Sequence, residues 1–141
     1  MITKENIICF STVDWDFLWQ SQHEIMSTFA QNRNRVLFID NTGVRTPKLR
    51  DIGRLKTRIL NWRKGIAGIR KESENLYVYS PIIFPFPYSR IFNFVNKLIV
   101  QSIIKKWMHL MCFSSPIVWV YLPTRLTMSL VRNLDAKLTI Y

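Results

Sequence analysis

The chain has 141 residues, of which 48% are hydrophobic and 13% aromatic, and its 20 Lys and Arg oppose 9 Asp and Glu, giving a formal net charge of +11. This composition excludes a disordered tail or a collagen-like fibre, and the length is that of one domain. The two cysteines, Cys9 and Cys112, are too few for a disulfide framework or a four-thiolate zinc site. Each lies in an apolar stretch, so we expect reduced, buried thiols and a reducing cytosol.

Short apolar runs alternate with stretches of helical periodicity along the chain. Residues 7–10 form the first predicted strand, and a helix is predicted over residues 15–31, with Asp14 and Asp16 in its first turn. The further expected elements are strands at 35–40, 76–80, 116–122 and 137–141, a long helix at 89–113 and a short helix at 126–133.

Strands that are apolar throughout and separated by helices indicate a parallel sheet covered on both faces. The sequence therefore predicts an α/β fold, namely a Rossmann-like, doubly wound parallel sheet of about five strands. We expect residues 1–141 to form a single, partial domain. Because the last predicted strand ends with the chain, we expect the sheet to be incomplete at its C-terminus.

No targeting segment or membrane span is predicted. The only apolar run near the N-terminus, residues 7–10, is too short for the core of a signal peptide. Residues 91–113 are long enough to span a bilayer, but they contain Lys97, Lys105 and Lys106. Each lysine at the bilayer centre costs about 2.5–3.5 kcal/mol, so we predict a helix that does not cross a membrane.

Residues 45–71 hold most of the net charge, because ten cations there face a single acid, Asp51. Apolar residues recur in this segment at steps of three or four, which predicts an amphipathic helical stripe with cations on the other face. The apolar positions of the stripe are Leu49, Ile52, Leu55, Ile59, Trp62, Ile66 and Ile69.

Three interpretations of this basic segment stay open. An anionic membrane surface fits a cationic helix with an aliphatic and Trp face. Nucleic acid needs the same cations, but is disfavoured because the segment has one Trp and no recognised nucleic-acid module. A solvated basic face over the sheet edge is the third. The predicted membrane-binding residues are Arg45, Lys48, Arg50, Arg54, Lys56, Arg58, Trp62, Arg63 and Lys64.

The triplet Asp14-Trp15-Asp16 matches a pattern with which some sugar-transferring enzymes hold a metal and a nucleotide diphosphate. Its place in the first turn after a strand favours a helix cap or a dipole partner, so no metal site is predicted. Asp40, after the second strand, stands where a dinucleotide fold puts its ribose-binding acid. Residues 11–16 contain no glycine, so we expect no such cofactor and interpret Asp40 as the cap of the turn at 41–43.

Two further features favour structural roles. His23 and His109 have no Cys or His partner at ligand spacing. Residues 81–88 (PIIFPFPY) form a proline-stiffened aromatic connector. Its aromatic side chains are suited to contact an apolar or sugar-bearing ligand. We favour the alternative that the connector is a hydrophobic wrap, in which these side chains pack over the core.

Four short segments of the sequence together carry a resemblance to a known protein family. They are residues 11–22 (STVDWDFLWQSQ) after the first strand, 35–41 (RVLFIDN), 75–81 (NLYVYSP) and 117–123 (IVWVYLP). Together and in this order they resemble the N-terminal half of a bacterial GT-B type glycosyltransferase, of the group-one or family-four kind that builds surface polysaccharides.

The resemblance implies transfer of a sugar from a nucleotide-sugar donor to a polysaccharide or lipid-linked acceptor, without an obligatory metal. It implies that this domain receives the acceptor and docks on the cytoplasmic face of the plasma membrane. The loop after the first strand borders the acceptor cleft in such enzymes, which assigns Thr12, Val13, Asp14 and Trp15 to it. No catalytic residue is assigned.

The sequence departs from the family pattern in two respects. Its first loop lacks glycine, and none of its glutamates has a second glutamate eight residues downstream, as the donor-binding domain of the family requires. We therefore expect the chain to be inactive without a separate donor-binding domain. The alternative hypothesis is a non-enzymatic basic α/β module that binds nucleic acid or an acidic partner.

Overall fold

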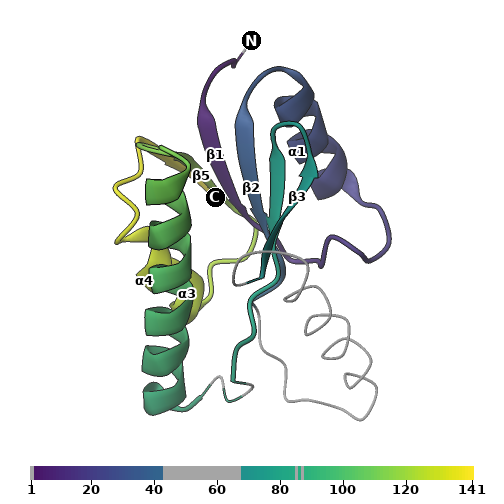
Figure 1. The fold of residues 1–141 in the computed structure, drawn as a ribbon. Helices are drawn as coiled ribbons and strands as arrows, with labels where there is room; N and C mark the ends of the chain where they lie inside the picture. The colour runs from purple at the N-terminus through teal and green to yellow at the C-terminus, as the bar shows by residue number, and fades with distance from the viewer. Residues whose placement is uncertain (1, 43–67, 85, 87) are drawn as a thin grey trace.

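The computed structural model describes residues 2–42, 68–84, 86 and 88–141. Figure 1 shows one sheet between helices. In chain order the elements are β1 (Asn6–Phe10), α1 (Ser21–Gln31), β2 (Arg35–Ile39), β3 (Ile69–Ser73), β4 (Leu76–Tyr79), α3 (Arg90–Leu110), β5 (Ile117–Val120), α4 (Arg125–Val131) and β6 (Leu138–Ile140).

The sheet has six strands in the order β3-β4-β2-β1-β5-β6. All neighbours pair in parallel except β3 and β4, which are antiparallel. The prediction of an α/β fold is thus confirmed, and the predicted parallel sheet of about five strands is corrected to a mostly parallel sheet of six. The five parallel strands are the ones that the apolar runs predicted, and the antiparallel edge strand β3 is the additional one.

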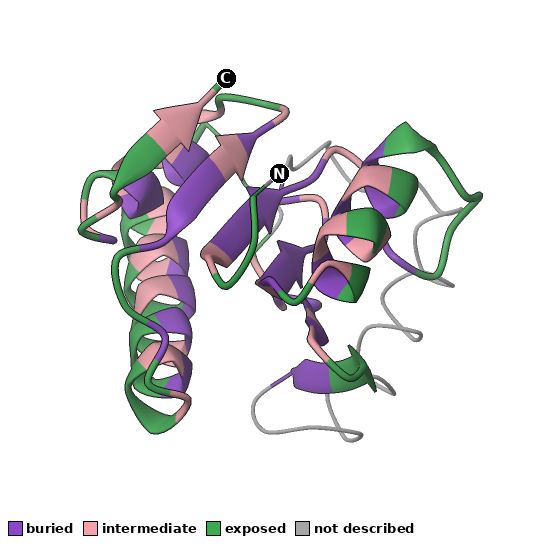
Figure 2. Cartoon of the chain, turned by 90° about the horizontal axis from the view of Figure 1, so that it is seen from above, coloured by how far each residue is buried: buried purple, intermediate pink, exposed green. Residues whose placement is uncertain are grey.

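The two faces of the sheet are buried against different helices (Figures 1 and 2). Ile8 and Leu37 point to the face covered by α3 and α4, whereas Cys9 and Phe38 point to the face covered by α1. This alternation follows from the two-residue period of a strand, and it explains why both strands are apolar at every position after their first residues, Asn6 and Arg35. The central strand β1 is paired on both sides, with Cys9 opposite Phe38 of β2 and opposite Trp119 of β5.

The long helix α3 lies where its periodicity predicted. Ser89 is its N-cap, and its hydroxyl accepts a hydrogen bond from the Phe92 N–H at 3.4 Å. One side of the helix is buried against the sheet, through Asn96, Val100, Ile104 and Trp107. No helix among the described residues is both long enough and apolar enough to cross a membrane.

The first helix begins later than predicted. It starts at Ser21 and not at Trp15, so Asp14 and Asp16 are not in its first turn, and their predicted roles as cap or dipole partner are wrong. Residues 15–20 follow a non-helical path because the Trp15 N–H donates to the side chain of Asp40 and its ring is buried under α1. Local periodicity was overridden by these tertiary contacts.

The end of the predicted basic stripe is also corrected. Residues 69–71 form strand β3 and not a helix, because a two-residue turn at 74–75 folds them back onto β4. The predicted membrane-binding residues Arg45, Lys48, Arg50, Arg54, Lys56, Arg58, Trp62, Arg63 and Lys64 lie outside the described residues.

Candidate functional site at the carboxyl edge of the sheet

The carboxyl ends of the parallel strands meet along one edge of the sheet. The loop after β1 begins there at Ser11, and Asp40, Ser80 and Tyr121 directly follow β2, β4 and β5. The chain order reverses at β1, since β2 and β4 lie on one side of it and β5 and β6 on the other. In open α/β sheets such a switch point is the usual place for a ligand. We therefore take this carboxyl edge as the candidate site.

The side chain of Gln22 in α1 is buried and holds the loop after β1 in place. Its Oε1 accepts hydrogen bonds from the Ser11 hydroxyl at 2.7 Å and from the Thr12 N–H at 3.2 Å. Its Nε2 donates to Thr12 Oγ1 at 2.6 Å. The Ser11 hydroxyl in turn accepts from the Val13 N–H at 3.0 Å. Thr12 and Val13 are thereby fixed at the edge.

Most main-chain N–H groups of this loop have acceptors within the protein. Two of them donate to main-chain carbonyl groups, Ser11 to Ile39 and Phe17 to Asp14. Three donate to side chains: Thr12 to Gln22 Oε1, Val13 to Ser11 Oγ and Trp15 to Asp40 Oδ1. A phosphate cradle requires N–H groups that point at the ligand instead. Because these five N–H groups already donate hydrogen bonds within the protein, they are not available to bind the diphosphate of a nucleotide.

Trp15 anchors the loop through its side chain. The buried indole packs edge-on against Phe38 of β2 and His23 of α1, with ring centroids 5.0 and 5.1 Å apart. Trp19 packs against both Trp15 and His23 but is itself exposed. Of the residues that the sequence assigned to an acceptor cleft, Trp15 is therefore part of the core, and its main chain is what lies at the edge.

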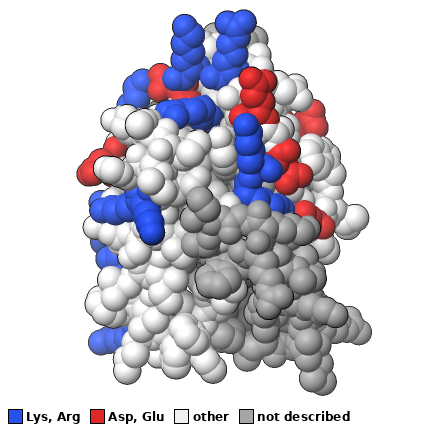
Figure 3. All heavy atoms as spheres, in the orientation of Figure 1, with Lys and Arg blue, Asp and Glu red and all other residues white. Residues whose placement is uncertain are grey.

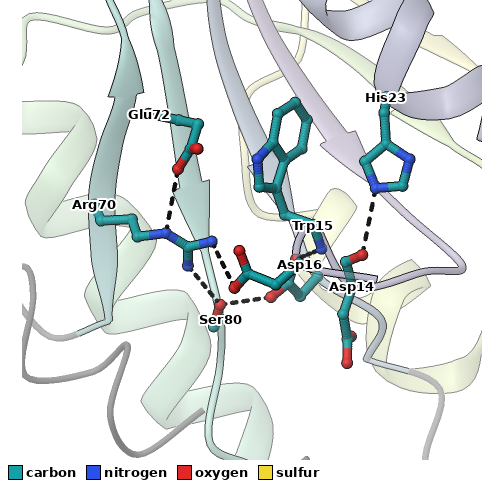
Figure 4. A network of polar contacts seen from close by, with 8 residues as sticks. Asp14, Trp15, Asp16, His23, Arg70, Glu72 and Ser80 are labelled. Carbon is teal, nitrogen blue, oxygen red and sulfur yellow. Dashed lines mark hydrogen bonds and ion pairs between the residues drawn. The ribbon is translucent and has the colours of Figure 1, made fainter. Parts of the chain in front are cut away.

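Asp14 presents its carboxyl group on the outer side of the loop. The buried His23 ring fixes its main chain: Nδ1 accepts from the Gln20 N–H at 3.0 Å, so neutral His23 carries its proton on Nε2 and donates to Asp14 O at 3.3 Å. Figure 4 shows the Asp14 carboxyl group directed away from Arg70 and Ser80. Asp14 and Asp16 thus point in different directions and do not share a ligand position.

Asp40 is a buried carboxylate that joins three strands. It is 2% exposed, and it accepts hydrogen bonds from the Trp15 N–H at 2.7 Å and from the Ser80 hydroxyl. The sequence interpretation confined Asp40 to capping its own turn. These two bonds also connect the loop after β1 and the end of β4 through the end of β2, which lies between them.

Arg70 of β3 completes the network (Figure 4). Its guanidinium donates to Ser80 Oγ at 3.2 Å and forms ion pairs with Asp16 at 2.9 Å and Glu72 at 3.4 Å. Arg70 is 9% exposed, so its charge is largely removed from water and is compensated by these groups. It is not one of the solvent-facing cations of the predicted amphipathic stripe.

Sequence reasoning missed Gln22, Arg70 and Ser80. A positional signal existed for Ser80, because it follows an apolar strand as Asp40 does and therefore reaches the same edge. Arg70 had no such signal, since its neighbours also fit a helical stripe. Gln22 lies on a predicted helix, and nothing in the sequence says that its amide turns back to the preceding loop.

In the described loop after β1, the five N–H groups named above already have acceptors, so side chains are the groups that we consider for a ligand. The hydroxyl of Thr12 and the carboxyl group of Asp14 suit a ligand that is rich in hydroxyl groups. Among the described residues no three His, Cys, Asp or Glu side chains are grouped to hold a metal ion. Comparisons with family models, with curated proteins and with solved structures find no match for the chain.

Proposed function

We propose that this chain is the acceptor-binding domain of a GT-B type glycosyltransferase, which moves a sugar from a nucleotide-sugar donor to a polysaccharide or lipid-linked acceptor. The order of the parallel strands, β4-β2-β1-β5-β6, supports this proposal because it is that of a Rossmann-like domain. The resemblance of residues 11–22, 35–41, 75–81 and 117–123 supports it from the sequence.

The observation that carries the proposal is the anchored loop after β1. Gln22, Asp40 and Arg70 hold it at the switch point, and most of its N–H groups donate to acceptors within the protein. Such a loop favours an acceptor over a nucleotide, and we place Thr12, Val13, Asp14 and the main chain of Trp15 against that acceptor. The donor nucleotide belongs to a separate donor-binding domain, without which we expect no transfer.

Membrane association is part of the same proposal. A lipid-linked acceptor is presented at a bilayer, and the cations between Arg45 and Lys64 suit an anionic surface. We place the chain at the inner face of the plasma membrane, as a peripheral protein of the cytoplasm. Vesicle flotation at low and high salt tests this contact, because electrostatic binding weakens as the ionic strength rises.

A titration of the isotope-labelled chain, followed by amide NMR, tests the acceptor site. We expect short oligosaccharides to shift the amide signals of residues 12–15, and UDP or GDP to leave them unchanged. Asp14→Asn should weaken the saccharide response, whereas Glu74→Gln, in the exposed turn between β3 and β4, should not. Shifts caused by the nucleotides and not by saccharides would contradict an acceptor domain.

A second candidate function is the basic module that binds nucleic acid or an acidic partner. It is favoured by charge, because residues 75–134 contain no acidic residue at all. Binding of DNA or RNA that falls steeply with salt, without any preference for lipid, would favour this module. Salt-dependent binding to anionic vesicles without nucleic-acid binding would favour the glycosyltransferase domain.

A further inference from the structure

An apolar surface covers the N-terminal half of α3 and the loop before it. Tyr88, Ile91 and Phe94 are 92%, 74% and 60% exposed. Of the described residues in this connector, Pro81 is buried and Ile83 packs against the core, as the expected hydrophobic wrap requires, whereas Phe84, Phe86 and Tyr88 are exposed. We name as the α3 surface the exposed residues Phe84, Phe86, Tyr88, Ile91, Phe94 and Leu98.

The helical members of the α3 surface form one stripe. Ile91, Phe94 and Leu98 are separated by three and four residues, so they lie on one side of the helix. At 3.6 residues per turn this side is opposite the buried stripe of Asn96 and Val100. Two turns of α3 therefore carry a stripe of apolar side chains on the side that faces away from the core, which a solvent-facing helix side does not require.

The loop part of the surface is held in place by the helix. Asn96, which is buried, accepts a hydrogen bond from the Phe84 N–H at 2.8 Å and donates one to the Phe84 carbonyl at 3.0 Å. The rings of Phe84 and Phe86 pack on Phe92, with centroid separations of 5.4 and 4.7 Å. The aromatic side chains are thus presented outward by a fixed main chain.

The charged side chains of the chain segment that carries the α3 surface have one sign. No Asp or Glu occurs between residues 75 and 134, which include all of α3 and α4. Arg90 and Lys97 flank the apolar stripe, and Lys105 and Lys106 follow on the same helix. Figure 3 shows uncharged atoms with scattered cations over the lower part of α3, where no acidic atoms are visible. An anionic partner is favoured by this distribution.

We propose that the α3 surface docks on an anionic lipid bilayer. The aromatic and aliphatic side chains enter the boundary between headgroups and acyl chains, and Arg90 and Lys97 meet the lipid phosphates. This combination of an apolar stripe with cations beside it is what an interfacial helix needs. The inference adds a second contact to the membrane association proposed above. It rests on α3 and the loop before it, not on residues 45–64, and it needs neither donor nor acceptor.

Co-sedimentation of the full chain with vesicles of mixed phosphatidylglycerol and phosphatidylcholine tests the proposal. The double variant Ile91→Ser/Phe94→Ser should bind at least about tenfold more weakly, because two large apolar side chains no longer leave water. Leu110→Ser is the matched control, since Leu110 is 59% exposed at the other end of α3, and it should bind like the wild type. Tyr88→Ser, outside the helix, repeats the test without touching α3, and circular dichroism checks that each variant is folded.

Two further experiments distinguish lipid docking by the α3 surface from docking by residues 45–64 and from contact between two copies. If Arg54→Gln/Lys56→Gln/Arg58→Gln abolishes vesicle binding while the α3 variants bind normally, the α3 surface is not the docking site. If sedimentation velocity shows a wild-type dimer that Ile91→Ser/Phe94→Ser dissociates with unchanged vesicle binding, the surface joins two copies, and the proposal is wrong. The α3 variants should show the same saccharide-induced amide shifts at residues 12–15 as the wild type. Vesicle binding therefore tests the α3 surface, and the amide shifts separately test the acceptor site.

Discussion

Arg70 and Asp16 are 54 positions apart in the chain, and an ion pair of 2.9 Å joins the edge strand β3 to the loop after β1. The two ends of this pair differ in environment, since the Arg70 side chain is 9% exposed and that of Asp16 is 45% exposed. The guanidinium also donates to Ser80, whose hydroxyl donates to Asp40. The antiparallel edge strand that the sequence did not reveal therefore helps to position the candidate site.

Arg70→Met should destabilise the chain by about 1–3 kcal/mol, because Ser80 and the carboxylates lose their common donor. The ion pair with the half-exposed Asp16 contributes at most about 1 kcal/mol of this. Lys71→Met is the matched control, since Lys71 is the exposed neighbour of Arg70 on the same strand, and its effect should stay within about 0.5 kcal/mol. Urea unfolding followed by tryptophan fluorescence measures both.

Coupling between Arg70 and Ser80 is a separate prediction. Because both belong to one hydrogen-bond network, the effects of Arg70→Met and Ser80→Ala should not add in the double variant, and the interaction energy should be about 0.5–3 kcal/mol. The four-member cycle of urea unfolding energies provides the measurement. Additive effects would show that Ser80 does not transmit the contact between Arg70 and Asp40.

Asn96→Ala should destabilise the chain by about 1–3 kcal/mol, because it leaves the N–H and carbonyl groups of Phe84 without their side-chain partner. Ser102→Ala, at an exposed position of the same helix, is the control and should be close to neutral. Thermal unfolding of both variants decides the matter. Equal melting temperatures for the two would mean that Asn96 does not hold the loop.

The strands of the parallel sheet were predictable because each is marked by a pattern of apolar residues within its own short segment. Residues 7–10 and 35–39 are apolar at nearly every position, and only a strand buried on both faces needs that pattern over so short a run. The long helix was predictable for the same reason, since its buried stripe recurs at helical spacing over several turns.

The start of α1 and the nature of β3 could not be predicted, because distant partners decide them. Trp15 fits a helical pattern, yet its N–H is bound by Asp40, 25 positions away. Ile69 and Arg70 continue an amphipathic helical spacing, yet they pair with Tyr79 and Val78 across a tight turn. The hydrogen-bond network of the candidate site also depends on residues that are distant in the sequence. It connects β3, β4, the end of β2 and the loop after β1.

The two thiols should differ in reactivity. Cys112 is exposed, so the expectation of a buried thiol is wrong for this residue. Cys9 is completely buried in the central strand, as expected, and burial raises the pKa of its thiol. We expect a thiol-specific disulfide reagent to modify only Cys112 in the folded chain, and both cysteines in denaturant. The Cys112→Ser variant should therefore be unreactive until it unfolds. Rapid modification of the folded Cys112→Ser chain would show that the sheet opens at β1.

Stability should fall at alkaline pH, because burial raises the pKa of the Cys9 thiol and of the Tyr79 hydroxyl. In the unfolded chain these groups ionise near their ordinary pKa values of about 8.5 and about 10. Above about pH 8.5 the unfolded state thus binds fewer protons than the folded state, and the free energy of unfolding decreases by up to about 1.4 kcal/mol per pH unit for each group. The stabilising contribution is complete below that pH and is lost as the pH rises.

Urea unfolding at pH values of about 7 and about 9.5 measures this effect, since Cys9 dominates the difference over that range. Cys9→Ala has a lower free energy of unfolding at both pH values because of the cavity, but its decrease between them should be smaller by about 1 kcal/mol. Cys112→Ala is the control and should keep the wild-type decrease, because Cys112 is exposed in the folded chain as well. An identical pH dependence in Cys9→Ala and the wild type would mean that the Cys9 thiol ionises as readily in the folded chain as in the unfolded one.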